Sequence, residues 1–198
     1  IMWWAIWDAP PTPVFNRPIY EATDTLNCIS DLTYNMVSEI FPHDQYPGKV
    51  NFIPHTLPKN IFRPLTPTEK LSYKSSLLGD DRADHFVGFW INRNAKRKRP
   101  NDVLISWSIF LDNLQKTHGH RKATLIMHTD PLDHEGPNLK YTAEMLGISR
   151  EVVFSTERLD FDKINILHNI ADFCLNISYA EGFGLGTLES MQAGNPII

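Results

Sequence analysis

The chain is poor in cysteine, and the two cysteines that it has do not form the pattern of a disulfide framework. Cys28 and Cys174 both lie in apolar, strand-like runs, which is typical of buried thiols. Thiols that stay reduced favour a reducing compartment, and we therefore expect a cytoplasmic location.

Long hydrophobic runs are also missing. The apolar stretch at the start, residues 1–7, is too short to cross a bilayer and lacks the basic residues that open a signal peptide. We expect no integral membrane segment and interpret this stretch as a buried strand.

An excess of positive charge is absent as well. The sequence holds 19 Lys and Arg against 23 Asp and Glu, a net charge of -4, which gives no general attraction to nucleic acid or to anionic membranes. The 42% hydrophobic and 21% charged residues are ordinary for a soluble globular protein. The length allows one large domain or parts of two.

Short apolar runs alternate with amphipathic stretches along the chain. This alternation predicts an α/β fold with a parallel sheet. We expect Asp31 to cap the second helix. Strands are predicted at 1–7, 25–30, 50–54, 85–90, 123–127, 152–155 and 173–177, and helices at 17–22, 32–41, 68–78, 102–114, 138–146, 162–169 and after Gly186. The buried face of the 102–114 helix should consist of Val103, Ile105, Trp107, Phe110, Leu111 and Leu114. Both ends of the chain have strand patterns, so we expect a fragment of a longer protein.

The segment 178–196 reads S-Y-A-E-G-F-G-L-G-T-L-E-S-M-Q-A-G-N-P. A strand, a glycine-rich loop and a helix N-terminus in that order form an anion site, because free N–H groups and the helix dipole converge there. Glu181 and Glu189 flank the loop. Since carboxylates repel phosphate, we expect one to meet a ribose diol and the other a sugar. The alternative, a capping box from Ser178 to Glu181, is disfavoured by the glycines that follow.

A second candidate segment is basic, with five cations at Arg93, Lys96, Arg97, Lys98 and Arg99. Three interpretations compete: a solvated or localisation cluster, a nucleic-acid patch and a diphosphate clamp. The segment lies in a strand-to-helix loop at the carboxyl edge of the predicted sheet, where α/β proteins bind ligands. Its position therefore favours the clamp.

Two histidine-containing loops are weaker candidates. The run 128–135 combines histidines with acidic residues, but Pro131 and Gly136 make it a loop without the helical ligand spacing of a preformed metal site, and we expect no metal there. His55 is either a loop residue or a ligand contact. Contacts in 155–159 should decide the choice of nucleobase.

The two main segments carry a resemblance to a known family. The run E-G-F-G-L-G-T-L-E-S-M-Q-A-G-N-P resembles the E-x7-E signature of retaining GT-B glycosyltransferases of family four, the glycosyl transferases group 1. Arg93 and Lys98 match the Arg and Lys of that family's Gly-Arg-x4-Lys-Gly segment, with Asn92 and Arg99 standing at the glycine positions. Residues 50–64 resemble the crossover between the family's two domains, with Thr56 at a common glycine position.

This resemblance implies an α/β fold of GT-B type with two Rossmann-like domains. Residues 1–58 would be the C-terminal part of the acceptor-side domain, 59–83 a linker, and 84–198 a nucleotide-sugar-binding domain that is incomplete at its C-terminus. The implied reaction is transfer of a sugar from a nucleoside diphosphate sugar to an acceptor, which is a glycan, lipid or protein, with retention of configuration.

The resemblance also implies roles for individual residues. Glu181, Arg93 and Lys98 would be catalytic, with Glu181 near the transferred sugar. Arg93, Lys98 and the loop residues Gly182, Phe183, Gly184 and Leu185 would bind the donor diphosphate, and Glu189 the ribose hydroxyls. No metal or other cofactor is expected. The alternatives are a nucleotide-sugar-binding module without turnover and, less favoured, a nucleic-acid-binding protein that uses 93–99.

Overall fold

A computed structural model describes all 198 residues, and the chain divides into two compact units. The first unit comprises Ile1–Thr56 together with Ala180–Leu185, and the second comprises Leu57–Tyr179 together with Gly186–Ile198. The domain boundaries inferred from the sequence, 1–58, 59–83 and 84–198, stay predictions.

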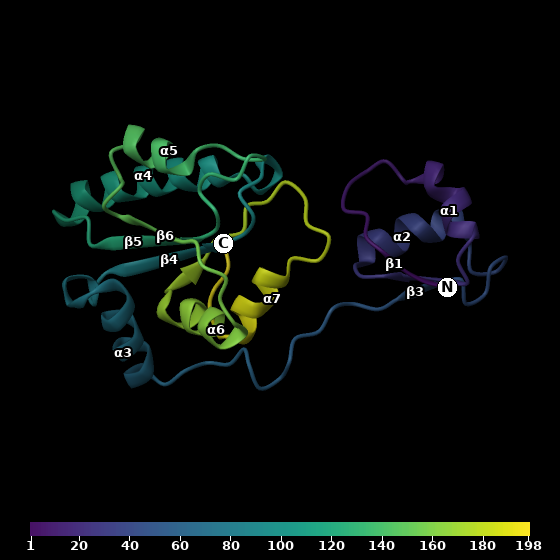
Figure 1. The fold of residues 1–198 in the computed structure, drawn as a ribbon, viewed down its shortest axis with the longest axis horizontal. Coiled ribbons are helices and arrows are strands. Elements are labelled where there is room, and N and C mark those ends of the chain that lie inside the picture. The colour runs from purple at the N-terminus through teal and green to yellow at the C-terminus, as the bar shows by residue number, and fades with distance from the viewer. The chain divides into compact units, whose positions relative to one another are not determined.

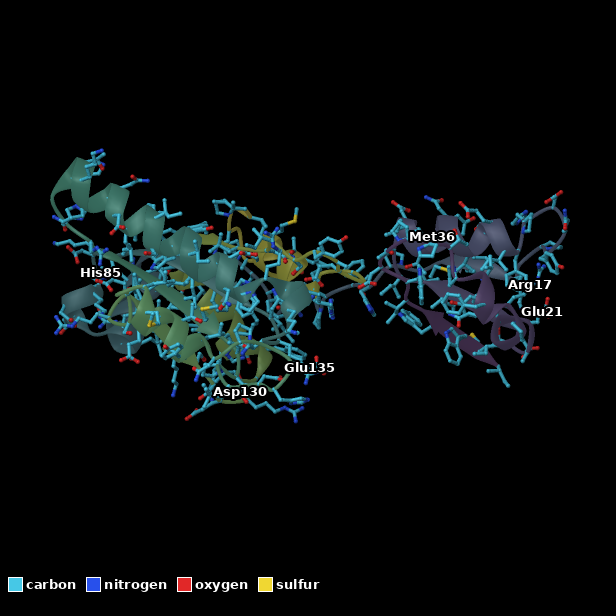
Figure 2. All side chains as sticks on the ribbon, turned by 90° about the horizontal axis from the view of Figure 1, so that it is seen from above. Arg17, Glu21, Met36, His85, Asp130 and Glu135 are labelled. Carbon is cyan, nitrogen blue, oxygen red and sulfur yellow. The ribbon has the colours of Figure 1, made fainter.

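The first unit is built on a three-stranded parallel sheet of order β1-β2-β3. Its strands are β1 (Met2–Ala5), β2 (Thr25–Cys28) and β3 (Val50–Phe52), and its helices are α1 (Arg17–Glu21) and α2 (Asp31–Ile40), with a short 3₁₀ turn at Val14–Asn16. Arg17 Nε donates to Glu21 Oε1 at 2.9 Å along α1, and both residues are marked in Figure 2. The buried core consists of Ala5, Tyr20, Leu26, Cys28, Val37, Ile40, Phe41 and Val50.

Two sequence predictions for this unit are wrong. The strand at the N-terminus is not buried, because β1 pairs only with β2 and leaves Trp3 44% and Trp4 45% exposed. Asp31 is not the cap of α2. The Ser30 side chain accepts from the Thr33 N–H at 3.2 Å, so Asp31 is the first residue of the helix.

The second unit contains a four-stranded parallel sheet of order β6-β5-β4-β7, with helices on both faces (Figure 1). Its strands are β4 (Phe86–Ile91), β5 (Ala123–His128), β6 (Val152–Ser155) and β7 (Phe173–Cys174). Its helices are α3 (Pro67–Leu78), α4 (Pro100–His118), α5 (Leu139–Met145), α6 (Phe161–Ile170) and α7 (Leu185–Gln192), with 3₁₀ turns at Asp80–Arg82 and Lys96–Lys98. Helices α4 and α5 lie on one side of the sheet, and α3 and α6 lie on the other.

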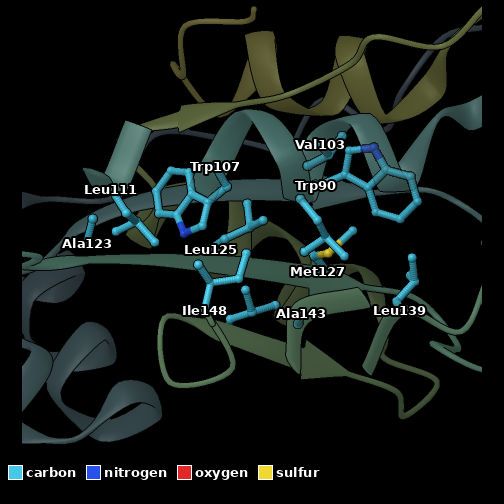
Figure 3. Packing of buried hydrophobic residues seen from close by; sticks show 12 residues of the cluster. Trp90, Val103, Trp107, Leu111, Ala123, Leu125, Met127, Leu139, Ala143 and Ile148 are labelled. Carbon is cyan, nitrogen blue, oxygen red and sulfur yellow. The ribbon is translucent and has the colours of Figure 1, made fainter. Parts of the chain in front are cut away.

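The two faces of this sheet carry separate cores, since successive strand residues point to opposite faces. Trp90 of β4 and Leu125 and Met127 of β5 pack with α4 and α5 (Figure 3). Val87 and Phe89 of β4 pack with α6 on the other face. Burial on both faces explains why these strands are continuous apolar runs in the sequence.

The buried face of α4 differs from the predicted one. Leu104 is fully buried, whereas Ile105 is 44% exposed. Leu104 lies three residues before Trp107 and seven before Leu111, so it shares their face of the helix, while Ile105 points away from them.

The strand order creates a topological switch point. From β4 the chain builds outward through β5 and β6, and then returns to place β7 on the opposite side of β4. The loops that follow β4 and β7 therefore leave the same edge of the sheet in opposite directions. Open α/β sheets bind ligands at this kind of position.

Residues 63–65 lie outside the sheet and are held to α6 by two asparagine side chains of that helix. Asn165 Oδ1 accepts from the Arg63 N–H at 3.1 Å, and Asn169 Oδ1 accepts from the Leu65 N–H at 2.8 Å. Asn169 Nδ2 donates in turn to the Arg63 carbonyl at 2.9 Å. Both asparagines are buried, and their amides satisfy backbone groups that no strand pairs with.

Candidate functional site

The loops after β4 and β7 meet at the switch point. The Tyr179 N–H donates to the Arg97 carbonyl at 2.7 Å, which ties the end of the β7 loop to the basic segment. At the start of α7, a Cβ added to Gly186 would lie 3.1 Å from the Ile91 side chain at the end of β4. Glycine at 186 therefore lets α7 approach the end of β4 closely.

Arg93, the first cation of the basic segment, is held by two acids from the loop after β5. Its Nε and Nη2 donate to Asp133 Oδ2 and Oδ1 at 2.8 and 3.3 Å, and Nη1 lies 3.0 Å from Glu135 Oε1. Glu135 is marked in Figure 2, with Asp130 of the same loop. The hydrogen bond from Arg93 lowers the pKa of Asp133 below its usual value, and the same bond raises the pKa of Arg93.

The other cations of the segment do not form one continuous cationic surface. Lys98 is only 5% exposed, which is rare for lysine. Arg99 turns its guanidinium to Asp102, with Nε donating to Oδ2 at 2.6 Å. Lys96 and Arg97 are exposed. These cations look equivalent in the sequence, but they differ in burial and in ion pairing in the structure.

The backbone at Arg99 accounts for the arginine that stands where the segment resembled by 93–99 has a glycine. Arg99 is the only non-glycine residue with positive φ, at 54°, and it immediately precedes α4. The left-handed conformation is the one that glycine adopts without strain. The position thus keeps the backbone geometry of a glycine although the side chain is arginine.

Helix α7 carries Glu189 at the switch point. The helix begins at Leu185 after Gly184, which has a φ of 83°, so the alternative capping box from Ser178 to Glu181 is excluded. The Glu189 side chain is 13% exposed, and its Oε2 lies 3.4 Å from Nε2 of the buried His168 on α6.

The first turn of α7 is fixed by Asn176. Its Nδ2 donates to Thr187 Oγ1 at 2.7 Å, and its Oδ1 accepts from Ser178 Oγ at 2.8 Å. Asn176 begins an Asn-x-Ser sequence that could be a glycosylation acceptor, but its amide is engaged inside the fold. The role of Asn176 in fixing the first turn of α7 is sufficient to explain an asparagine at this position.

The loop with Glu181 and its neighbours, Ala180–Leu185, groups with the first unit. There the Phe183 ring meets His55 edge-on, with ring centroids 5.2 Å apart, and His55 stacks on Trp4 at 5.6 Å. A Cβ on Gly182 would lie 2.7 Å from the Ile6 side chain. His55 is thus an aromatic packing residue in this unit. The pairing of Glu181 with Arg93 and Lys98 stays a prediction.

The loop after β5 holds its histidine and acids in other interactions. His128 Nδ1 lies 2.9 Å from Ser155 Oγ at the end of β6. Burial lowers the pKa of His128, and the nearby His168 lowers it further. Asp133 bonds to Arg93, and no group of three or more His, Cys, Asp or Glu side chains that could hold a metal ion is found.

Several residues near the site are missed by sequence reasoning. In the sequence, Asp133 and Glu135 stand out only as metal-ligand candidates, because their pairing with Arg93 depends on how the loops after β4 and β5 fold. His168 lies among Ile164, Leu167 and Ile170 in the sequence of α6. A polar residue on the apolar face of an amphipathic helix is a signal that could have found it.

Comparisons with known proteins agree with this architecture. No protein-family model matches the sequence, and no curated protein matches it significantly. Solved structures do match. Sucrose-phosphate synthase from Thermosynechococcus elongatus superposes with a TM-score of 0.68 at 18% identity over 92% of this chain and 42% of that one. Anabaena HepE in complex with UDP and glucose gives 0.71 at 18% identity over 93% and 47%. WaaG, a glycosyltransferase involved in lipopolysaccharide biosynthesis, gives 0.67 at 18% identity over 87% and 43%.

These likenesses confirm the predicted fold class, which is α/β of the GT-B type with parallel sheets. The chain spans less than half the length of each of the three proteins. None of its own helices combines the length and hydropathy that a membrane crossing requires.

Proposed function

We propose that this chain is the donor-binding part of a glycosyltransferase that transfers a sugar from a nucleoside diphosphate sugar. The observation that carries the proposal is the switch point of the second unit. There the Arg93–Lys98 segment is tied to the end of the β7 loop by the bond from Tyr179 to Arg97, and Glu189 follows on α7. The similar HepE structures, whose complexes contain UDP, UDP-glucose or UDP with glucose, support a nucleotide-sugar donor.

The chemistry explains why cations belong there. Glycosyl transfer passes through an oxocarbenium-like transition state and leaves negative charge on the departing phosphate. Arg93 offers a planar fork of donors and Lys98 a point charge, and charge at the leaving group is stabilised best by groups that are already in place. Asp133 and Glu135 hold the Arg93 side chain without using all of its N–H donors, so the guanidinium can accept an anion as well.

The remaining roles follow the resemblance. Glu189 accepts hydrogen bonds from the ribose hydroxyls, and the backbone N–H groups of 183–185 bind the diphosphate. Glu181 lies beside the transferred sugar, and the product keeps the configuration of the donor. The proposal assigns charge neutralisation to Arg93 and Lys98 rather than to a metal ion. The acceptor is a glycan, lipid or protein, and a cytoplasmic location fits the reduced thiols.

The binding-module alternative shares this donor site, whereas the nucleic-acid alternative needs a different surface. Arg99 is paired with Asp102, Lys98 is buried, and Arg93 is held by Asp133 and Glu135 with only part of its N–H donors left for a phosphate. Lys96 and Arg97 are exposed, and two such cations make a small surface for phosphate backbones.

Calorimetric titration with UDP, GDP and ADP tests the donor site. We expect one of the three to bind, Arg93→Gln to weaken it about tenfold or more through loss of a charge-assisted bond, and Arg99→Gln to leave it unchanged as the matched control. The absence of binding to all three would refute the proposal. Binding to an oligonucleotide with a steep salt dependence would favour the alternative.

Turnover and stereochemistry need the full-length protein. A donor screen that detects released nucleoside diphosphate separates an enzyme from a binding module. The anomeric proton coupling of the product, measured by NMR before it equilibrates, shows retention or inversion. An inverted product would overturn the retaining mechanism while leaving the donor site intact.

A further inference from the structure

A buried histidine connects Glu189 to a cysteine in the core of the second unit. His168 is fully buried on α6, with its ring between Phe89, 5.0 Å away, and Phe62, 6.1 Å away by ring centroids. Its Nε2 lies 3.4 Å from Glu189 Oε2, and its Nδ1 lies 3.5 Å from Cys174 Sγ. Glu189 comes from α7, His168 from α6 and Cys174 from β7, and the three side chains form a chain of polar contacts in the interior.

The direction of each hydrogen bond follows from the groups present. An ionised carboxylate only accepts, so Nε2 of His168 carries the proton and donates to Glu189. An imidazole that is protonated at Nε2 alone accepts at Nδ1. Burial raises the pKa of Cys174 to about 11, so the sulfur keeps its hydrogen at neutral pH and donates it to Nδ1.

Asn195 supports this assignment from the other side. Its Nδ2 donates to the His168 carbonyl, and the same nitrogen lies 3.9 Å from Cys174 Sγ. The Cys174 sulfur therefore accepts from Asn195 Nδ2, while its own hydrogen is directed to the His168 imidazole. Asn195 lies three residues after the end of α7 and is 8% exposed, so it also links the segment after that helix to α6.

We propose that His168 is a positioning residue, which holds the Glu189 carboxylate in the orientation that accepts from the ribose hydroxyls, and that Cys174 fixes the tautomer in which His168 does so. The inference rests on the proposed function, because the role of Glu189 toward ribose is part of that function. A partly buried carboxylate with a fixed donor on one side loses less freedom when its ligand binds. The contact of 3.4 Å is long for a hydrogen bond, and such bonds tighten when the ligand is present.

The test compares two ligands that differ only in the hydroxyls. The tightest binder among UDP, GDP and ADP and its 2′,3′-dideoxy form are titrated into the wild-type chain and the variants. His168→Phe keeps an aromatic ring between Phe62 and Phe89 but donates nothing to Glu189. We expect it to weaken the ribose nucleotide about tenfold, or about 1.4 kcal/mol, and to leave the dideoxy form unchanged.

Two further variants separate positioning from packing. His168→Gln carries an amide N–H that can reach Glu189, and it should bring the affinity back to within about threefold of the wild type, well short of the tenfold loss. In the double variant His168→Phe with Glu189→Gln, the affinity should equal that of Glu189→Gln alone, because both changes remove the same interaction.

The tautomer has its own readout. The ¹⁵N shifts of the His168 ring in the free protein should show a protonated Nε2 and an unprotonated Nδ1. Cys174→Ser, which keeps a hydroxyl donor, should preserve this pattern, and Cys174→Ala, in which only the Glu189 carboxylate selects the tautomer, should show it less completely. A protonated Nδ1 in the wild type would overturn the inference even if no His168 variant folds.

The outcomes distinguish the two proposals. If the wild type binds none of the three nucleotides, the proposed function fails and the inference fails with it. If the wild type prefers the ribose form but His168→Phe weakens both ligands equally, or neither, the proposed function stands and the positioning role of His168 is wrong.

Discussion

Gly136, in the loop after β5, should tolerate no side chain, and its replacement tests whether that loop supports the basic segment. A Cβ at this position would lie 2.0 Å from Oδ1 and 2.5 Å from both Cγ and the backbone oxygen of Asn94. Asn94 is fully buried, and its Nδ2 donates to the Pro137 carbonyl at 2.9 Å. A different rotamer of Asn94 cannot remove the clash, because one of the three atoms belongs to the backbone.

The expected cost of Gly136→Ala follows from these distances. Overpacking in a closed site costs about 1–3 kcal/mol, and an overlap of this size should reach the upper end. Loss of the Asn94 hydrogen bond adds about 1 kcal/mol. The total of about 4 kcal/mol should lower the melting temperature by roughly 8–16 °C in thermal denaturation. Because Asn94 follows Arg93 directly, nucleotide affinity should fall as well.

Gly88→Ala is the matched control. Gly88 lies in the middle of β4, where a Cβ would meet the Trp107 and Phe173 rings at 3.1 to 3.3 Å. This variant should lower the melting temperature and leave nucleotide affinity unchanged, because the crowding is in the core. An unchanged melting temperature in Gly136→Ala would refute the packing argument. Lower stability with unchanged affinity would refute the link to Arg93.

Three further predictions test single features. The free energy of unfolding in denaturant should be about 0.5–1 kcal/mol higher for Arg99→Gly than for Arg99→Ala. Both variants lose the ion pair, but only glycine adopts the left-handed conformation without strain. Equal free energies of unfolding would contradict this. The pKa of Asp133 is lowered by Arg93, so its stabilisation is present above its usual pKa and is lost as pH falls through the lower folded value. Melting temperatures from about pH 5 to about pH 3 should therefore fall less steeply in Asp133→Asn than in the wild type, and an equal slope would argue against the pairing. The pKa values of Cys28 and Cys174 are each raised to about 11 by burial, so thiol reagents at neutral pH should label both only after unfolding, and rapid labelling of the native chain would contradict their burial.

The sequence predicts the number of strands and their places along the chain well, because strands buried on both faces are continuous apolar runs between helical patterns. It predicts their ends less well. The strand expected at 173–177 is only Phe173–Cys174, since the chain then turns into the loop that Asn176 and Tyr179 fix. That loop is held by contacts with α7 and the basic segment, which local patterns do not encode.

The candidate site residues stand out in the sequence in the same uneven way. The Arg93–Lys98 segment and Glu189 stand out because a loop at the carboxyl edge and a glycine-rich turn have recognisable chemistry. The partners of Arg93 do not stand out, because Asp133 lies 40 positions away and approaches only when β4 and β5 pair. His168 is 21 positions from Glu189 and reaches it across the packing of α6 against α7.

The amide clamp from α6 to residues 63–65 has a practical consequence. The conformation of this stretch is fixed by hydrogen bonds to Asn165 and Asn169, which lie 102 to 106 positions further along the chain than their partners. Substitutions within 63–65 that keep the backbone N–H and carbonyl groups should be tolerated. Replacing Asn165 or Asn169 with leucine should free this stretch from α6 and make it susceptible to proteolysis. Anyone who redesigns this region should therefore choose residues on the distant helix first and the apparent loop second.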